Sequence, residues 1–168
     1  MSGSLPDILA KNLEVVFCGI NPGVQAAVTG HHFVGRNNRF WNTIHLAGFT
    51  PEQISPENDR MILRFRCGLT TVAERATARA CELSSHEIIS DSAKLERKIV
   101  KYRPRYIAFL GKSAYQTISK QRKTLWGAQD STFGGAAVWV LPNPSGRNLA
   151  FSRDALADAY RALRLMLG

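Results

Sequence analysis

Two loops of this chain, each built around an Asn-Pro pair, carry side chains that could form a ligand site. Asn21 lies in the segment Gly-Ile-Asn-Pro-Gly at 19–23, and Asn143 lies in Pro-Asn-Pro-Ser-Gly at 142–146. An amide side chain donates and accepts hydrogen bonds but takes up no proton near neutral pH, so it can orient a ligand or a water without acting as a general base. Each loop directly follows a short apolar run that is typical of a buried strand. Because open α/β sheets bind ligands at the carboxyl ends of their strands, we expect the two loops to face each other across one cleft.

The charge of the chain narrows the class of partner. Lys and Arg outnumber Asp and Glu by 22 to 13, which gives a net charge of +9 and an isoelectric point near 9.9. Several arginines lie in or beside the presumed loops: Arg36, Arg39, Arg147 and Arg153. An excess of this size favours a polyanionic partner such as nucleic acid. A basic surface that is merely solvated is the alternative that composition leaves open.

Spacing and composition argue against several other classes of protein. No apolar run approaches the roughly 20 residues that span a bilayer, and residues 1–7 have neither a basic start nor an apolar signal core. We therefore expect a cytoplasmic protein with no membrane partner. Cys18, Cys67 and Cys81 lack metal-ligand spacing and are predicted to be reduced thiols. We predict no metal ion and no cofactor, and no G-x-G-x-x-G follows a strand to indicate a Rossmann-type nucleotide site.

The segments that must position the loops alternate between strand-like and helix-like patterns, which is typical of an α/β fold with a mostly parallel sheet. Buried strands are expected at about 14–18, 106–110 and 137–141, and 67–72 is either a short strand or an extended stretch. Helices are expected over 38–48, with Asn38 as the N-cap, and over 56–65, 85–102, 112–121 and 154–167. No linker divides the chain, so we predict one α/β domain over residues 1–168.

Four motifs follow one another along the chain in a recognisable order. They are Gly-Ile-Asn-Pro-Gly at 19–23, Gly-His-His-Phe at 30–33, Asn-Arg-Phe-Trp at 38–41 and Leu-Pro-Asn-Pro-Ser-Gly at 141–146. Together they resemble the mismatch-specific uracil/thymine DNA glycosylases, a branch of the uracil-DNA glycosylase superfamily, and the similarity runs from about residue 8 to the final helix. The resemblance implies a three-layer fold with helices on both sides of the central sheet. It also implies a monomeric, monofunctional hydrolase that releases uracil, and also thymine or ethenocytosine, opposite guanine in double-stranded DNA. Its product would be an abasic site for downstream repair enzymes.

The same resemblance assigns roles to individual residues. Asn21 would orient the water that attacks the sugar, and Asn143 would support the carbonyl oxygen of the departing base, where other branches carry an aspartate and a histidine. Two amides stabilise developing charge less strongly than those groups, so a slow reaction is expected. Phe33 would stack on the flipped base. The other base contacts would come from Ile20, Gly23, Ala26 and Thr71, and the contacts to DNA and the wedge from Ser145, Gly146, Arg147 and Asn148.

Other interpretations of several residues stay open. Asn21 could form a simple Asx-turn, Phe33 could be a core aromatic, and Arg147 could bind a phosphate instead of filling the gap left by the flipped base. We interpret His31 and His32 as structural, one of them exposed. The tryptophans Trp41, Trp126 and Trp139 are predicted to be core residues.

Two other functions compete with the mismatch-specific enzyme. The first is a uracil glycosylase that is indifferent to the opposite base. The second is a non-catalytic nucleic-acid-binding α/β module that keeps the fold and the charge. Lyase chemistry is not expected in any case, because Lys112 and Lys120 fall on a predicted helix and are interpreted as solvated.

Overall fold

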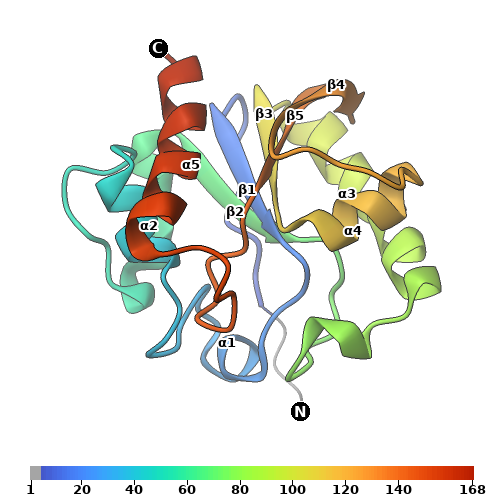
Figure 1. Cartoon of the computed structure of the whole chain (residues 1–168), viewed down its shortest axis with the longest axis horizontal. Coiled ribbons are helices and arrows are strands. Elements are labelled where there is room, and N and C mark those ends of the chain that lie inside the picture. The colour runs from blue at the N-terminus through green and yellow to red at the C-terminus, as the bar shows by residue number, and fades with distance from the viewer. Residues whose placement is uncertain (1–4) are drawn as a thin grey trace.

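One five-stranded sheet forms the centre of the molecule, with strands in the order β2-β1-β3-β5-β4 (Figure 1). The computed structural model describes residues 5–168. Residues 1–4 lie outside the described part, and they belong to the segment 1–7 that we expect to carry no secretion signal. Four strands are parallel to their neighbours and β4 is antiparallel. The strands are β1 Val15–Gly19, β2 Cys67–Thr71, β3 Tyr106–Leu110, β4 Gly127–Phe133 and β5 Ala136–Leu141. The carboxyl ends of β1, β2, β3 and β5 therefore meet at one edge of the sheet.

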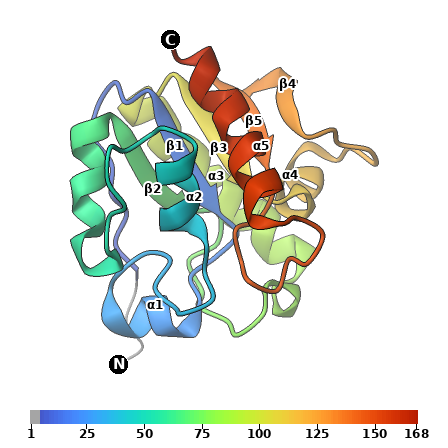
Figure 2. The same ribbon diagram turned by 60° about the vertical axis from the view of Figure 1, so that its left-hand side comes forward.

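Helices cover both faces of this sheet, which confirms the predicted three-layer α/β architecture (Figures 1 and 2). One face is covered by α2 (Phe40–Leu46) and α5 (Arg153–Met166), and the other by α3 (Ser85–Tyr102) and α4 (Lys112–Ser119). The short helix α1 (Val24–Thr29) and the loop between β5 and α5 both lie at the edge where the parallel strands end (Figure 2).

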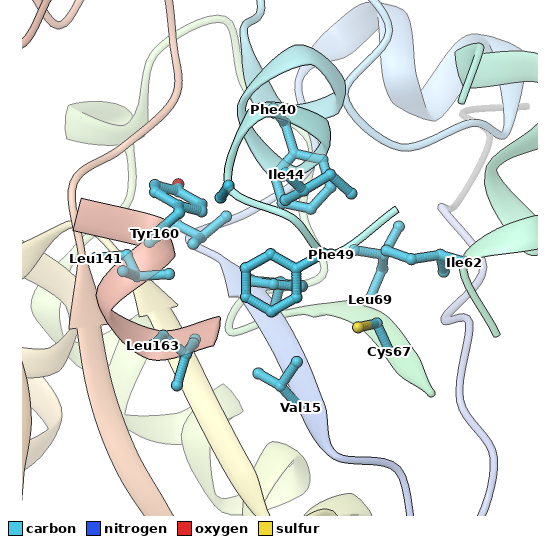
Figure 3. Close-up of a cluster of buried hydrophobic side chains, with 14 of the residues drawn as sticks. Val15, Phe40, Ile44, Phe49, Ile62, Cys67, Leu69, Leu141, Tyr160 and Leu163 are labelled. Carbon is cyan, nitrogen blue, oxygen red and sulfur yellow. The ribbon is translucent and has the colours of Figure 1, made fainter. Parts of the chain in front are cut away.

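Strands β1, β3 and β5 are apolar because helices bury both of their faces. Phe17 of β1 packs toward α2 and α5, whereas the next residue, Cys18, packs toward α3 and α4. The Phe17 ring meets Phe40 edge-on, with 5.3 Å between the ring centroids, and Figure 3 shows Phe40 of α2 and Tyr160 of α5 in the same buried cluster. Burying a side chain of this size contributes about 1.5–3 kcal/mol. This core fixes the strand ends that carry the site.

Most predicted elements are present, and the ambiguous segment 67–72 is strand β2. Three elements were not predicted: α1, in a stretch taken for a loop, the short 3₁₀ helix η2 (Ala80–Glu82), and β4. The predicted helix over 56–65 is present as 3₁₀ turns, η1 (Pro56–Phe65), with a kink at Asn58, where the backbone leaves the helical region. The Asn38 side chain accepts a hydrogen bond from Phe40 N at 2.9 Å, so it supports the start of α2, although the helix begins one residue later than predicted.

The prediction that all three tryptophans are core residues is wrong for Trp126. Trp41 and Trp139 are buried, but 42% of Trp126 is exposed. Trp126 lies just before the edge strand β4, where no second layer covers it. Its ring packs edge-on against Phe151, and Lys112 Nζ lies 4.4 Å from the ring centroid.

Candidate active site

A cavity of about 610 Å³ opens at the edge where the parallel strands end. Both Asn-Pro loops contribute to its wall, as the sequence predicts, and its size is within the range of pockets that hold small molecules. All but one of the predicted site residues line it: Ile20, Asn21, Gly23, Ala26, Phe33, Thr71, Asn143, Ser145, Gly146 and Arg147. The exception is Asn148. The topology of the sheet therefore brings together residues that lie far apart in the sequence.

The amide of Asn21 is held in one orientation by two hydrogen bonds. Its Nδ2 donates to the backbone oxygen of Arg75 and to Thr77 Oγ1, both at 2.8 Å. Thr77 is buried, and its own hydroxyl donates to the oxygen of Arg79 at 2.7 Å. Both hydrogens of the amide are used in this way, and no donor within residues 5–168 reaches Asn21 Oδ1. Asn21 thus offers a free hydrogen-bond acceptor at the cavity wall.

The amide of Asn143 has the opposite orientation. Its Oδ1 accepts a hydrogen bond from the backbone N–H of Ser145 at 2.9 Å, which leaves both hydrogens of Nδ2 available as donors. The backbone oxygen of Asn143 accepts from Asn148 Nδ2 at 3.0 Å. One wall of the cavity thus presents an acceptor and another presents a donor, and neither side chain titrates near neutral pH.

Phe33 is half-buried and lines the same cavity as the two amides. One face of its ring stacks on Phe40 of the core, with 4.1 Å between centroids and 19° between planes. Its backbone is in the left-handed region, with φ of 54°, which is uncommon for an aromatic residue. Strained conformations of this kind cost about 1–3 kcal/mol and cluster at functional sites. Phe40 of the core thus supports the Phe33 ring, which is an aromatic part of the cavity wall.

The other residues that we predicted to contact the base form a mostly apolar part of the cavity wall. Ala26 is buried and Ile20 is half-buried, and both line the cavity. Thr71 donates its hydroxyl hydrogen to the backbone oxygen of Ala73 at 2.9 Å, so toward a ligand it can act only as an acceptor. Gly23 is exposed, and its surroundings are open.

Comparison with known proteins identifies the family of the chain. Residues 6–164 match the model of the uracil DNA glycosylase superfamily. The chain belongs to this superfamily. Membership implies a DNA glycosylase, a hydrolase of DNA repair. The chain is also similar to the solution NMR structure of a candidate uracil DNA glycosylase from Methanosarcina acetivorans, with a TM-score of 0.65 and 22% identity over 97% of this chain and 98% of that one. That likeness supports the shared fold.

Residues 144–151, which we call the outer loop, contribute Ser145, Gly146 and Arg147 to the wall of the uracil DNA glycosylase cavity. A second hollow, of about 680 Å³, lies between this loop and residues 78–81 and shares Asn143, Ser145 and Arg147 with the cavity. Asn148 lines this second hollow, where its side chain also braces Asn143. The two hollows adjoin through these shared residues, and we call the pair the groove.

The charge around this groove is positive. Arg36, Arg79 and Arg147 line it and are exposed, and no Asp or Glu is among the described residues that line either hollow.

Residues 5–168 contain no cluster of three or more His, Cys, Asp or Glu side chains that could hold a metal ion. Within the same residues, no helix has the length and apolarity to cross a membrane.

The two neighbouring histidines take part in a buried network. His32 is buried, and its Nε2 lies 2.7 Å from the oxygen of Pro6, while its backbone N–H donates to Asp59 Oδ2 at 2.9 Å. Burial lowers the pKa of His32, so the ring is neutral near pH 7 and Nε2 carries the donated hydrogen. His31, more exposed, lies 3.4 Å from Asp59 Oδ1. This geometry supports structural roles for both rings.

Two residues that shape the site were not predicted. Thr77 orients Asn21, and Arg39 holds the outer loop through several backbone oxygens. In the sequence, nothing indicates the role of Thr77 or of Arg39 except that each residue lies in or near one of the motifs. Both depend on contacts between segments that only the folded chain brings together.

Proposed function

We propose that this protein hydrolyses the N-glycosidic bond of uracil opposite guanine in double-stranded DNA, leaving an abasic site. The observation that carries this proposal is the opposed orientation of the two amides. Asn21 presents a free acceptor, Asn143 presents free donors, and no carboxylate of the described residues lines the cavity. Such a pair suits a reaction in which a neutral water attacks while negative charge develops on a departing base.

In this mechanism the target nucleotide leaves the duplex and enters the cavity, at a cost of a few kcal/mol. The base stacks on the exposed face of Phe33. Asn143 Nδ2 donates to a carbonyl oxygen of the base and stabilises the charge that develops there. The bond between the sugar and the base breaks, and its electron pair leaves with the base.

The water held by Asn21 Oδ1 then forms the new bond to the sugar carbon. An amide cannot accept the water's proton, so that proton passes to solvent and the departing base is protonated in turn. The sugar cation receives no stabilisation from a carboxylate. We therefore expect a slow enzyme whose rate depends on the quality of the leaving group.

Selectivity for mispairs is proposed to come from the outer loop. Arg147 is exposed at the mouth and could fill the gap left by the flipped base, where it or a loop carbonyl would meet the orphaned guanine. The short side chain of Ala26 leaves room for a 5-methyl group, which extends the proposed substrates to thymine. Because the wall at Ala26 leaves this room, the proposed substrates also include ethenocytosine.

A substrate panel tests this function. A labelled oligonucleotide carrying uracil opposite guanine, opposite adenine or in a single strand, and thymine opposite guanine, is incubated with excess protein and treated with alkali. Strong preference for uracil opposite guanine supports the proposal. Equal cutting of all uracil substrates would support the pairing-indifferent enzyme, and no cutting would support the non-catalytic module.

A further inference from the structure

The Asn21 amide is held by residues 73–79, a segment between β2 and η2 that we call the brace segment. Two backbone hydrogen bonds also tie this segment to the loop that carries Asn21. They run from Ala73 N and Thr77 N, at 2.9 and 3.2 Å, to the oxygens of the two residues that flank Asn21. Asn21 and the brace segment therefore form one hydrogen-bonded unit, and the orientation of the amide depends on what holds this unit to the rest of the molecule.

The side chain of Arg75 connects the brace segment to α3. Its Nε and Nη2 donate to the two carboxylate oxygens of Glu87, at 2.9 and 3.0 Å, and Nη2 also donates to the oxygen of Glu82 at 3.0 Å. The two parallel donors match the rigid fork that a guanidinium offers to a carboxylate. The residue before it, Glu74, adds a second link, because its backbone N–H donates to Asp91 Oδ2 at 3.0 Å. The brace segment is therefore attached to α3 at two successive residues.

Glu87 is a well-fixed anchor for this contact. It is the third residue of α3, and its backbone N–H donates to Oγ of the N-cap residue Ser84 at 3.0 Å. The sequence Ser-x-x-Glu at 84–87 has the pattern of a capping box, in which the glutamate side chain reaches back to the N–H of the N-cap residue. Both carboxylate oxygens of Glu87 accept from Arg75 instead. The next residue, Ile88, is buried in the core under α3, so the helix fixes the position of the carboxylate.

The ion pair between Arg75 and Glu87 adds little to stability, yet it is connected directly to Asn21. The two side chains are 53% and 26% exposed, and ion pairs that water reaches in this way contribute little to the free energy of unfolding. The hydrogen bonds from Arg75 lower the pKa of Glu87, so the carboxylate stays charged across the neutral range. The backbone oxygen of Arg75 accepts from Asn21 Nδ2 at 2.8 Å. One backbone group thus joins the ion pair to the amide at the cavity wall.

We propose that Arg75 and Glu87 are positioning residues for the reaction: their ion pair fixes the backbone oxygen of Arg75 and, through it, the direction of Asn21 Oδ1. This inference rests on the proposed function, in which Asn21 Oδ1 holds the attacking water. Breaking the pair should slow the chemical step and leave the affinity for DNA unchanged, since neither side chain lines the groove. A pair that only stabilised the fold would lower the melting temperature and leave the rate of the folded enzyme unchanged.

The test uses Arg75→Met, Glu87→Ala and the double variant, with Arg66→Met as the matched control. Arg66 directly precedes β2, at the edge of the sheet opposite the site, and its ion pair with Glu14 has similar exposed fractions of 65% and 28%. Both arginine variants lose one positive charge, so general effects of charge on DNA binding are matched. Release of uracil opposite guanine in a duplex is followed in single turnovers over a range of protein concentrations. This separates the maximal rate from the half-saturating concentration, and thermal melting checks that each variant is folded.

We expect Arg75→Met and Glu87→Ala each to lower the maximal rate about three- to thirtyfold, less than the roughly hundredfold that a displacement of 1 Å can cost. The double variant should lose no more than either single variant, because the two residues act as one unit. The half-saturating concentration should stay within about twofold of the wild-type value, as expected when substrate binding is unchanged. Arg66→Met should match the wild type in both quantities.

A folded Arg75→Met variant with the wild-type maximal rate would overturn the proposal. Equal slowing by Arg66→Met, a loss confined to the half-saturating concentration, or single-variant losses that multiply in the double variant would overturn it as well. If Arg75→Met does not fold, Glu87→Ala decides in its place, since it keeps the backbone N–H that donates to Ser84. A wild-type protein that releases no uracil would refute the proposed function and the positioning role together. An active wild type with unimpaired variants would refute the positioning role alone.

Discussion

The substitution Thr77→Val tests whether the orientation of Asn21 matters for the reaction. Valine has nearly the shape of threonine but lacks the hydroxyl, which accepts from Asn21 Nδ2 at 2.8 Å and donates to the oxygen of Arg79 at 2.7 Å. Two buried hydrogen bonds are lost, and each contributes about 0.5–1.5 kcal/mol to stability. The free energy of unfolding should therefore fall by about 1–3 kcal/mol.

The effect on the rate follows from the same contacts. Asn21 keeps its second hydrogen bond, to the oxygen of Arg75, so the amide loses one of two restraints. A loss of about 1 kcal/mol in positioning lowers the rate roughly fivefold, with a range of about two- to twelvefold. Single-turnover release of uracil from a duplex, with protein in excess, measures this step apart from product release.

The matched control is Thr77→Ser, which keeps the hydroxyl and removes only a methyl group. Serine should retain the wild-type rate, while its stability falls by about 0.8 kcal/mol for the lost methyl. DNA affinity should be unchanged in both variants because Thr77, although it lines the cavity, is only 6% exposed. A folded Thr77→Val variant with the wild-type rate, or a serine variant as slow as the valine variant, would refute the reasoning.

Three further predictions concern stability and the thiols. Gly146→Ala would force its new methyl against Asn37 O, 2.5 Å away, so the melting temperature should fall by about 3–10 °C. Gly23→Ala, whose new methyl meets nothing within 4 Å, should leave the melting temperature unchanged. Equal melting temperatures for the two variants would contradict the close contact between Gly146 and Asn37. Because burial lowers the pKa of His32 in the folded state, the unfolded chain takes up the proton first, and stability should be lost as the pH falls below about 6.5. Denaturant titrations at pH 7 and pH 5 should show a smaller loss for His32→Gln than for the wild type. An unchanged difference in the free energy of unfolding between the two pH values would exclude His32 as the source of the loss. A thiol reagent should label only the exposed Cys81 in the native protein and all 3 cysteines after unfolding, since burial raises the pKa of Cys67 to about 12 and that of Cys18 well above its usual value; rapid labelling of a second native thiol would show that the core opens.

The sequence predicts the parts of the fold that are buried on both sides. Strands β1, β3 and β5 are continuous apolar runs because helices cover both faces of the sheet at these positions. Strand β4 is largely polar and exposed, since it lies at the edge and pairs on one side only, so its residues carry no comparable pattern. Trp126 is exposed for the same reason, because it directly precedes this edge strand.

The site could be predicted as far as its motifs extend. Asn21 and Asn143 stand out because each follows a buried strand, and the sheet topology then brings them to one cavity. Which atom of each amide is free could not be predicted, because it depends on partners such as Thr77, which is 56 residues from Asn21 in the chain. The contacts of Arg39 with the outer loop span more than 100 residues and are equally invisible in a linear pattern.

The central claim is that Asn21 holds the attacking water, and one comparison tests it most directly. Wild-type protein and Asn21→Ala, with Asn58→Ala as a matched exposed asparagine, are given a duplex with one uracil opposite guanine, and alkali-labile breaks are counted under single-turnover conditions. Binding to the same duplex is measured in parallel. We expect Asn21→Ala to cut at least about a hundredfold more slowly, the usual cost of removing one positioned catalytic group, while its binding and that of the control stay at the wild-type level. Cutting by Asn21→Ala at close to the wild-type rate would contradict the account.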